Sequence, residues 1–362
     1  MNIIIDKNLI SAPISKLVGI TEKRSLMPIL SNILISFGRE KTTIYSTDLE
    51  LSAISHIDYK TDEEKKIVVH GKKFLEILKE MDNGEINLEI KENTLTIRQK
   101  QTEIVLSLQE PDEFPEVREI KGFEEFSLNG GVLREIVEKV NFAISNDETR
   151  YILTGMHIKG NEGKIVVVGT DGFRMALYQK DIENIKLFKG ITIPKRSMSE
   201  IERIIGDDDN VKLSIDDKHI QFSTDKATVV SRIIEGNFPD YDNVIPQQSE
   251  NTAVVKKEYF LRGLRRVSSI MGRSEPVKIT LSAGCMEIEA ESDIGHAREM
   301  INIIYEGETM SLNFNVRFIL DIVSHIEGKK IIVKVPPTYG AVLFEEENGA
   351  EYYKNIVMPI RV

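Results

Sequence analysis

Residues that could catalyse a reaction or bind a metal form no recognisable motif in this 362-residue sequence. Its six histidines lack ligand spacing, and it has no phosphate-binding glycine loop, dinucleotide-binding glycine fingerprint or HExxH helix. Its single cysteine, Cys285, lies in the strand-like run CMEIEAE, which favours a small buried residue over a nucleophile. The stretch TDGFRMA (residues 170–176) places Asp171 near Arg174. An enzyme with its site there stays open as an alternative.

The composition is typical of a globular protein that has two or three domains. Hydrophobic residues make up 41% and charged residues 29% of the chain. One cysteine excludes an internal disulfide framework and fits a reducing compartment. No apolar run approaches the ~18 residues that cross a membrane. The N-terminal sequence MNIIIDKNLI predicts a first strand and not a signal peptide.

One supersecondary unit recurs about every 60 residues, as an amphipathic helix followed by short strands. The candidate helices begin near Lys7, Gly71, Gly130, Lys195, Val255 and Asn315. Alternating apolar and polar residues predict β-hairpins at 86–99, 211–224 and 277–290, after the second, fourth and fifth helices. The pattern predicts an α+β fold in which helices cover one face of mostly antiparallel sheets.

Two polar or charged segments, 117–125 and 246–253, have the composition of linkers. They divide the chain into three similar domains, at 1–120, 125–246 and 254–362. Each third holds two helix-plus-strand units. We therefore expect each domain to be a pseudo-twofold pair of units.

The net charge of −11 is unevenly distributed. Six helix windows carry a net charge of +8, and the rest of the chain carries −19. These windows are 7–19, 71–81, 130–145, 195–206, 255–271 and 315–326. Basic helices in an acidic protein indicate a surface for a polyanion. The alternative is that these cations only solvate the outer faces of the helices.

Three further stretches predict partly exposed contact residues. A sharp turn at Asp171 and Gly172 should leave Phe173, Arg174 and Met175 partly exposed. The segment GNFPDYDNVIP (236–246) is an aromatic loop bounded by proline. The terminal NIVMPIRV (355–362) should pair as a strand up to Ile356 or Val357 and then cross the surface, because Pro359 cannot donate to a ladder. Met358 and Ile360 would then be available to a partner.

These stretches, together with MPILSNILI (27–35), resemble the beta sliding clamps of bacterial replicative DNA polymerases, and the resemblance runs from Met1 to Val362. It implies a DNA clamp fold, in which a head-to-tail homodimer closes a six-domain ring around duplex DNA. The implied function is a non-catalytic processivity factor, without metal or cofactor, in the cytoplasm at the nucleoid. Polymerase subunits, the clamp loader and repair proteins would dock through short peptide motifs. An interaction scaffold unconnected with DNA stays a further alternative.

The resemblance also implies three sets of site residues. The peptide pocket would comprise Leu153, Thr170, Gly172, Phe173, Arg174, Met175, Pro239, Asn243, Val244, Val342, Val357, Met358, Pro359, Ile360 and Arg361. The DNA-binding positions would be Arg24, Lys72, Lys73, Asp147, Tyr151, Ile152, Lys195 and Arg196. The dimer interface would use Ile104, Leu106, Ile270 and Met271.

Four of these positions depart from the family pattern. Phe173 stands where the family often has histidine, and Asn243 stands where a basic residue is frequent. Asp147 replaces a neutral residue, and Ile152 replaces an aromatic one that could stack on DNA. The first change makes the pocket more apolar, and the other three weaken contacts to a partner or to DNA.

Overall fold

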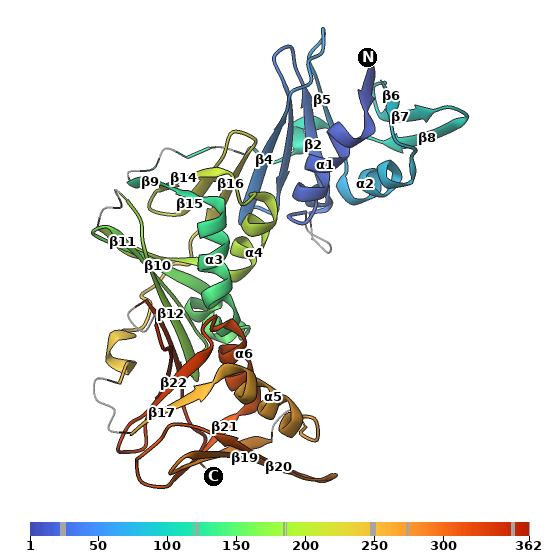
Figure 1. Cartoon of the computed structure of the whole chain (residues 1–362). Helices are drawn as coiled ribbons and strands as arrows, with labels where there is room; N and C mark the ends of the chain where they lie inside the picture. Colours follow the sequence, from blue (N-terminus) through green and yellow to red (C-terminus); the bar gives the residue numbers. More distant parts are fainter. Residues whose placement is uncertain are drawn as a thin grey trace. The chain divides into compact units, whose positions relative to one another are not determined.

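The computed structural model describes residues 1–21, 27–117, 119–120, 122, 124–183, 185, 187–246, 251–272, 275–348 and 352–361. The chain forms two compact units (Figure 1). Unit 1 comprises Met1–Arg134 and Arg196–Ile233, and unit 2 comprises Glu135–Lys195 and Ile234–Val362. Each unit therefore takes strands from two of the three segments that the sequence predicts as domains.

Unit 1 contains two antiparallel sheets, in the orders β5-β2-β3-β4-β16-β15-β14-β9 and β1-β6-β7-β8. The strands of the larger sheet are β2 (Asn32–Phe37), β3 (Thr42–Thr47), β4 (Leu51–Ile57), β5 (Lys65–His70), β9 (Glu124–Asn129), β14 (Asn210–Ile215), β15 (His219–Ser223) and β16 (Ala227–Arg232). The smaller sheet contains β1 (Asn2–Asp6), β6 (Glu85–Ile90), β7 (Thr94–Gln99) and β8 (Thr102–Ser107).

Unit 2 has the same composition, with sheets in the orders β13-β10-β11-β12-β24-β23-β22-β17 and β20-β19-β18-β21. The larger sheet contains β10 (Gly155–Asn161), β11 (Lys164–Thr170), β12 (Arg174–Asp181), β13 (Phe188–Pro194), β17 (Asn251–Lys256), β22 (Lys330–Val335), β23 (Val342–Glu346) and β24 (Tyr353–Val357). The smaller sheet contains β18 (Pro276–Ser282), β19 (Cys285–Ser292), β20 (Gly295–Asn302) and β21 (Met310–Asn315).

The helices bury their apolar stripes against these sheets and against each other. They are α1 (Lys7–Leu17), α2 (Gly71–Glu80), α3 (Gly130–Val140), α4 (Lys195–Ile204), α5 (Lys257–Ser268) and α6 (Val316–His325). Figure 1 shows α1 beside α2 and α5 beside α6, and these pairs are in contact. The amphipathic period is the cause: Phe74 and Leu78 on α2, and Ile319 and Ile322 on α6, are fully buried.

The predicted helices and hairpins are confirmed, with small shifts at two starts. The fifth helix begins at Lys257 and not at Val255, because β17 continues to Lys256. The sixth begins at Val316, and the Asn315 side chain caps it by accepting a hydrogen bond from Arg317 N. The first strand, β1, is also confirmed.

Other expectations need correction. Cys285 opens a strand as expected but is only half-buried. Strands β9 and β17 begin inside the two predicted linkers, at Glu124 and Asn251. Positions 118, 121, 123 and 247–250 of those linkers lie outside the described residues.

The two eight-stranded sheets repeat each other residue by residue. In each, a strand that follows one helix pairs antiparallel with a strand from the next domain segment. Ser52 pairs with Val230 in unit 1 as Met175 pairs with Ile356 in unit 2. Each four-stranded sheet corresponds to one half of an eight-stranded sheet and so contains only one member of this strand pair.

Candidate functional site

The turn between β11 and β12 is built by side chains that hydrogen-bond to its own backbone. Asp171 Oδ1 accepts from the backbone N–H groups of Phe173 and Arg174, each at 2.9 Å. Thr170 Oγ1 accepts from Gly172 N at 3.0 Å and donates to Arg174 O at 2.7 Å. Gly172 has φ +85°, a conformation that side chains disfavour. The turn therefore holds Phe173 at the surface, where its side chain is 54% exposed.

An apolar pocket of about 130 Å³ opens beside this turn. Its walls come from the 3₁₀ helix η4 (Glu148–Thr154), the turn, the 238–244 loop and the C-terminal tail. The lining residues are Leu153, Thr170, Gly172, Phe173, Arg174, Met175, Phe238, Pro239, Asp240, Tyr241, Val244, Ile356 and Met358. Phe173, Val244 and Met358 are also among the exposed large hydrophobic residues, so the pocket presents apolar surface to solvent.

Arg174 is partly exposed as expected, but the expectation of partial exposure is wrong for Met175. Met175 belongs to the buried cluster under the pocket and is 4% exposed. The Arg174 guanidinium donates to Asp171 Oδ2 at 3.1 Å, Asp321 Oδ2 at 2.5 Å and Phe142 O at 2.6 Å. A planar group with three such acceptors is fixed in place and positions the turn.

The 238–244 loop is held by an aromatic cluster on strand β10. The His157 ring stacks on Phe238 with centroids 4.4 Å apart, and Lys159 Nζ lies 4.8 Å from the centre of the Tyr241 ring. Burial, with a smaller effect of the Lys159 charge, lowers the pKa of His157 to about 4. The ring is therefore neutral at physiological pH and packs as an aromatic residue.

Nine of the residues predicted for the peptide pocket line it together. These are Leu153, Thr170, Gly172, Phe173, Arg174, Met175, Pro239, Val244 and Met358. Val342 and Val357 pair with each other on neighbouring strands and are fully buried, so they do not line the pocket. Asn243 is exposed and does not line the pocket, but its side chain donates to the lining residue Asp240, at Oδ2, at 2.7 Å.

The end of the tail leads away from the pocket. Strand β24 ends at Val357, as the sequence predicts, and Met358 N then donates to Phe173 O at 2.8 Å. Ile360 N donates to Asn313 O on β21 at 2.7 Å, and Pro359, Ile360 and Arg361 line a separate groove there. Ile360 is 39% exposed.

Four lining residues were missing from the predicted set: Phe238, Asp240, Tyr241 and Ile356. Three of them lie in the loop that the sequence had singled out, so the aromatic character of that loop was the signal. Ile356 could be found only from the register of β24 against β12, which places it opposite Met175.

The predicted DNA-binding residues divide between the two units. Lys72 and Lys73 are exposed on α2, and Lys73 forms an exposed ion pair with Glu76 at 2.9 Å. Arg196 on α4 is bound to Asp48 at 2.8 Å and to Ile20 O at 3.2 Å. Arg24 lies outside the described residues.

In unit 2 the remaining predicted residues lie on or near η4. Tyr151 is 60% exposed, and Ile152 beside it is half-buried. Lys195 Nζ donates to Asn146 Oδ1 at 3.1 Å, next to Asp147. Asp147 accepts from Thr149 N and Thr149 Oγ1, which lowers its pKa and keeps it charged. Its charge opposes a phosphate at this position.

The predicted interface residues lie at or near exposed ends of the two smaller sheets. Ile104 and Leu106 on β8 are half-buried, with exposed Val105 between them. Ile270 and Met271 follow α5 and are also half-buried. Within the described part of the chain, β8 and β20 each pair with one neighbouring strand and leave the other edge open.

Two features are absent from the described residues. None of the helices there is long and apolar enough to span a membrane. The same residues contain no group of three or more His, Cys, Asp or Glu side chains placed to hold a metal ion.

The repeated helix-and-sheet units, with the apolar pocket beside Phe173, define a protein of the DNA clamp class. Three family models match successive parts of the chain: the N-terminal domain of the DNA polymerase III beta subunit over residues 1–118, its central domain over 127–240 and its C-terminal domain over 242–361. The chain belongs to the DNA polymerase III beta subunit family, the beta sliding clamps.

Individual relatives agree over the full length. The beta sliding clamp of Pseudomonas putida is 26% identical over 369 residues that cover 100% of both chains. The crystal structure of the DNA polymerase III beta subunit from Pseudomonas aeruginosa matches with a TM-score of 0.95, at 25% identity over 100% of both chains. A structure of the P. aeruginosa clamp bound to griselimycin matches with a TM-score of 0.94, at 25% identity and the same coverage.

Proposed function

We propose that this protein is a non-catalytic processivity factor: two copies close head to tail into a ring around duplex DNA and tether a DNA polymerase to it. The observation that carries this proposal is the pair of open edges at β8 and β20. In both eight-stranded sheets, the strand equivalent to β20 pairs with the strand equivalent to β8. The same pairing between two copies completes a third and a fourth such sheet.

The repeat also defines the register of this proposed junction. When the sheets are aligned strand by strand, His296 on β20 takes the position that Met175 has in unit 2 and Ser52 has in unit 1. Val105 on β8 takes the position of Ile356 in unit 2 and Val230 in unit 1. His296 then faces Val105 across the junction. Two further facing pairs follow.

Ala297 lies opposite Ile104 in this register, and both side chains are half-buried on the helix-covered face of their sheets. Arg298 lies opposite Glu103, which gives a pair of opposite charges. The apolar pair and the charge pair favour this alignment over a one-residue shift, which would move every side chain to the other face. A head-to-tail contact of this kind avoids an open filament only if it closes into a ring.

The helices supply the proposed DNA-facing surface. Lys72 and Lys73 on α2, and Arg262 and Arg265 on α5, are exposed cations. Contacts to phosphate across a hydrated hole are screened within about 8 Å at physiological salt, so they stay weak and independent of sequence. Ring closure and not affinity would retain the protein on DNA, which agrees with its net charge of −11.

The pocket beside Phe173 is the proposed docking site for polymerases and for the clamp loader and repair proteins. Its exposed rim of Phe173, Val244 and Met358 suits a short peptide with apolar anchors. Its polar groups are used internally, because Asp171 and Arg174 bind each other and the turn. Apolar contact would therefore dominate binding, and the side chain of Asn243 is held by Asp240.

The test uses the full-length protein and circular DNA. We expect light scattering to give twice the chain mass of 41.1 kDa. Protein loaded onto nicked circular DNA should stay bound through gel filtration in high salt and leave when the circle is cut once. A monomer at micromolar concentration, or equal retention on circular and linear DNA, would contradict the proposal.

A further inference from the structure

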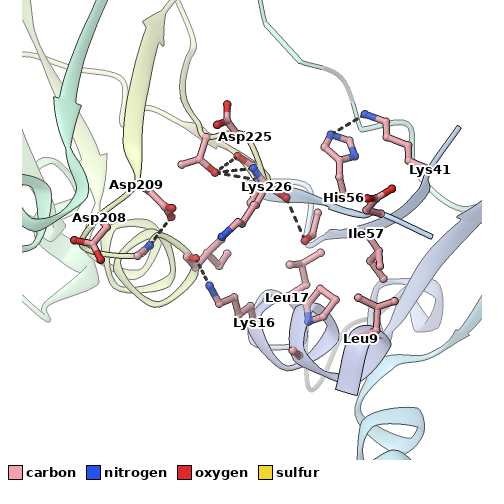
Figure 2. Close-up of a pocket in the computed structure, with 18 of the residues that line it drawn as sticks. Leu9, Lys16, Leu17, Lys41, His56, Ile57, Asp208, Asp209, Asp225 and Lys226 are labelled. Atoms are coloured by element: carbon pink, nitrogen blue, oxygen red, sulfur yellow. Dashed lines mark hydrogen bonds between the residues drawn. The ribbon is translucent and has the colours of Figure 1, made fainter. Parts of the chain in front are cut away.

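A second cleft, in unit 1, lies away from the pocket beside Phe173. It has a volume of about 830 Å³ and is formed by α1, the end of β4, the residues after α4 and the β15–β16 turn. In Figure 2, Leu9 and Ile57 lie on one side of the cleft, and Asp208 and Asp209 lie on the other. We call it the α1 cleft.

Unit 2 contains the same cleft in its repeated copy. There it is formed by α3, the end of β12, the residues after α6 and the β23–β24 turn, and its volume is about 370 Å³. One contact identifies the two as equivalent. Lys16 Nζ donates to Ile204 O at 2.9 Å, and Lys139 Nζ donates to His325 O at 3.3 Å, at matching helix positions.

Tyrosine side chains occupy the unit 2 copy. Tyr178 and Tyr353 face each other across β12 and β24, with ring centres 5.8 Å apart. The Tyr353 hydroxyl donates to Lys139 O at 2.9 Å, and the Tyr178 hydroxyl donates to Glu135. Glu135 also accepts from Lys180 Nζ at 2.8 Å. These four side chains lie between helix α3 and the sheet.

Small or apolar residues occupy the same four positions in unit 1. Ser55 faces Ala227 across β4 and β16, in place of the two tyrosines. Ala12 stands in the place of Glu135, and Ile57 stands in the place of Lys180. The absence of two phenol rings and an ion pair is consistent with the larger volume of the cleft in unit 1. The small side chains of Ser55, Ala227 and Ala12 therefore form the base of the cleft, beside the exposed Leu9.

The rim of the α1 cleft is acidic. Asp58, Asp207, Asp208, Asp209 and Asp225 line it, against three lysines. Lys16 and Lys41 are engaged with Ile204 O and His56 Nε2. Among the described residues, Asp208 and Asp225 have no ion-pair partner, and both are exposed. The carboxyl-terminal end of α4 adds a partial negative charge to this side.

We propose that the α1 cleft is a second docking site, and that its occupant is a segment of a partner protein with aromatic side chains next to a basic residue. The aromatic rings would take the volume that Tyr178 and Tyr353 fill in unit 2. The basic group would lie against Asp208 and Asp225. This site uses none of the residues of the pocket beside Phe173 and does not depend on the proposed function.

The test is calorimetric titration of the full-length protein with the synthetic peptide Ac-Lys-Tyr-Tyr-Lys-NH2. We expect saturable binding that weakens about tenfold or more with Ac-Lys-Ala-Ala-Lys-NH2, because the rings supply most of the buried area. Ac-Glu-Tyr-Tyr-Glu-NH2 should also bind more weakly. Binding of the acidic peptide with equal affinity, or no binding of the basic peptide at millimolar concentration, would overturn the proposal.

Variants that fill the cleft give the second arm. Ser55→Tyr with Ala227→Tyr restores the unit 2 pattern and should abolish peptide binding. Ala12→Phe fills the same space from an exposed helix position, so it serves if the double variant fails to fold. Met358→Ala, in the other pocket, should bind the peptide like the unchanged protein. Unchanged binding by Ala12→Phe would overturn the proposal. So would self-association of the protein that Ala12→Phe abolishes, because a second copy would then be the occupant.

Discussion

Arg174 Nη1 lies 2.5 Å from Asp321 Oδ2, and this ion pair joins the turn that carries Phe173 to helix α6. The Arg174 side chain is 11% exposed, whereas that of Asp321 is 43% exposed. The two ends of the pair therefore have different surroundings. Arg174 cannot replace its partners with water, but Asp321 can.

This asymmetry predicts different costs for the two truncations. Arg174→Ala leaves Asp171 Oδ2 and Phe142 O without the guanidinium donor and should lower the free energy of unfolding by about 3 kcal/mol. Asp321→Ala leaves Arg174 two acceptors and should cost about 1 kcal/mol. Urea unfolding measures both values.

Lys73→Ala, which removes an exposed ion pair, is the control and should change stability by less than about 0.5 kcal/mol. Equal costs for Arg174→Ala and the control would show that the guanidinium does not hold the turn.

Met358 predicts how much of the pocket affinity comes from the tail. It is 36% exposed and lies beside Phe173, so a bound ligand would bury its thioether. Met358→Ala should weaken the proposed binding of a short peptide with apolar anchors by about tenfold, or about 1.4 kcal/mol, measured by surface plasmon resonance.

Two further variants separate local from general effects on that binding. Deletion of residues 358–362 should weaken it at least as much and leave the dimer intact. Leu187→Ala is the matched control, because Leu187 is 67% exposed and lies outside the pocket. If the deletion leaves the affinity unchanged, the pocket has been assigned to the wrong surface.

The sequence predicts local structure well in this chain because each element carries its own periodicity. The stripe of Ile10, Ile14 and Leu17 defines α1, and the alternation in β18 and β19 defines their hairpin. Leu9 lies beside this stripe in the sequence, but its side chain is exposed and lines the α1 cleft.

Relationships between distant segments could not be predicted in the same way. The pairing of β4 with β16 joins segments on either side of a predicted domain boundary, and no local pattern encodes it. Consequently the sequence alone could not predict that Ile356 lines the pocket or that β20 has an open edge. It also could not predict that Ser55 in unit 1 takes the position of Tyr178 in unit 2, because both depend on the registers. The motifs of the pocket were recognisable, but the burial of Met175 and the triple anchoring of Arg174 were not.

His157 predicts an acid-dependent loss of stability in unit 2. Its pKa is lowered from 6.5 to about 4 in the folded state by burial against Phe238. Below pH 6.5 the unfolded chain therefore binds a proton that the folded chain does not. The stabilising contribution is complete above pH 6.5 and decreases as the pH falls toward 4, by on the order of 2–3 kcal/mol.

Urea unfolding between pH 7 and pH 4 measures this contribution against His157→Phe. The phenylalanine keeps an aromatic ring against Phe238 but does not titrate. We expect the stability of the variant to fall less steeply over this range than that of the unchanged protein. Parallel curves would mean that His157 is protonated in the folded state or that its ring is already exposed.

The register of the proposed junction predicts a specific cross-link between two copies. Val105 is 54% exposed, and His296 is exposed on the equivalent face of β20. If the copies pair as β4 pairs with β16, these residues lie directly opposite, at a separation that a disulfide can span. In a Cys285→Ser background, Val105→Cys with His296→Cys should form a covalent dimer under mild oxidation, read by non-reducing electrophoresis.

Moving the second cysteine to Met300, four residues along the same face, should abolish the cross-link because the separation along the strand then exceeds the reach of the bond. Efficient cross-linking from Met300 and not from His296 would mean that the strands pair in another register. Failure of both, with the dimer present in solution, would mean that the two edges do not meet.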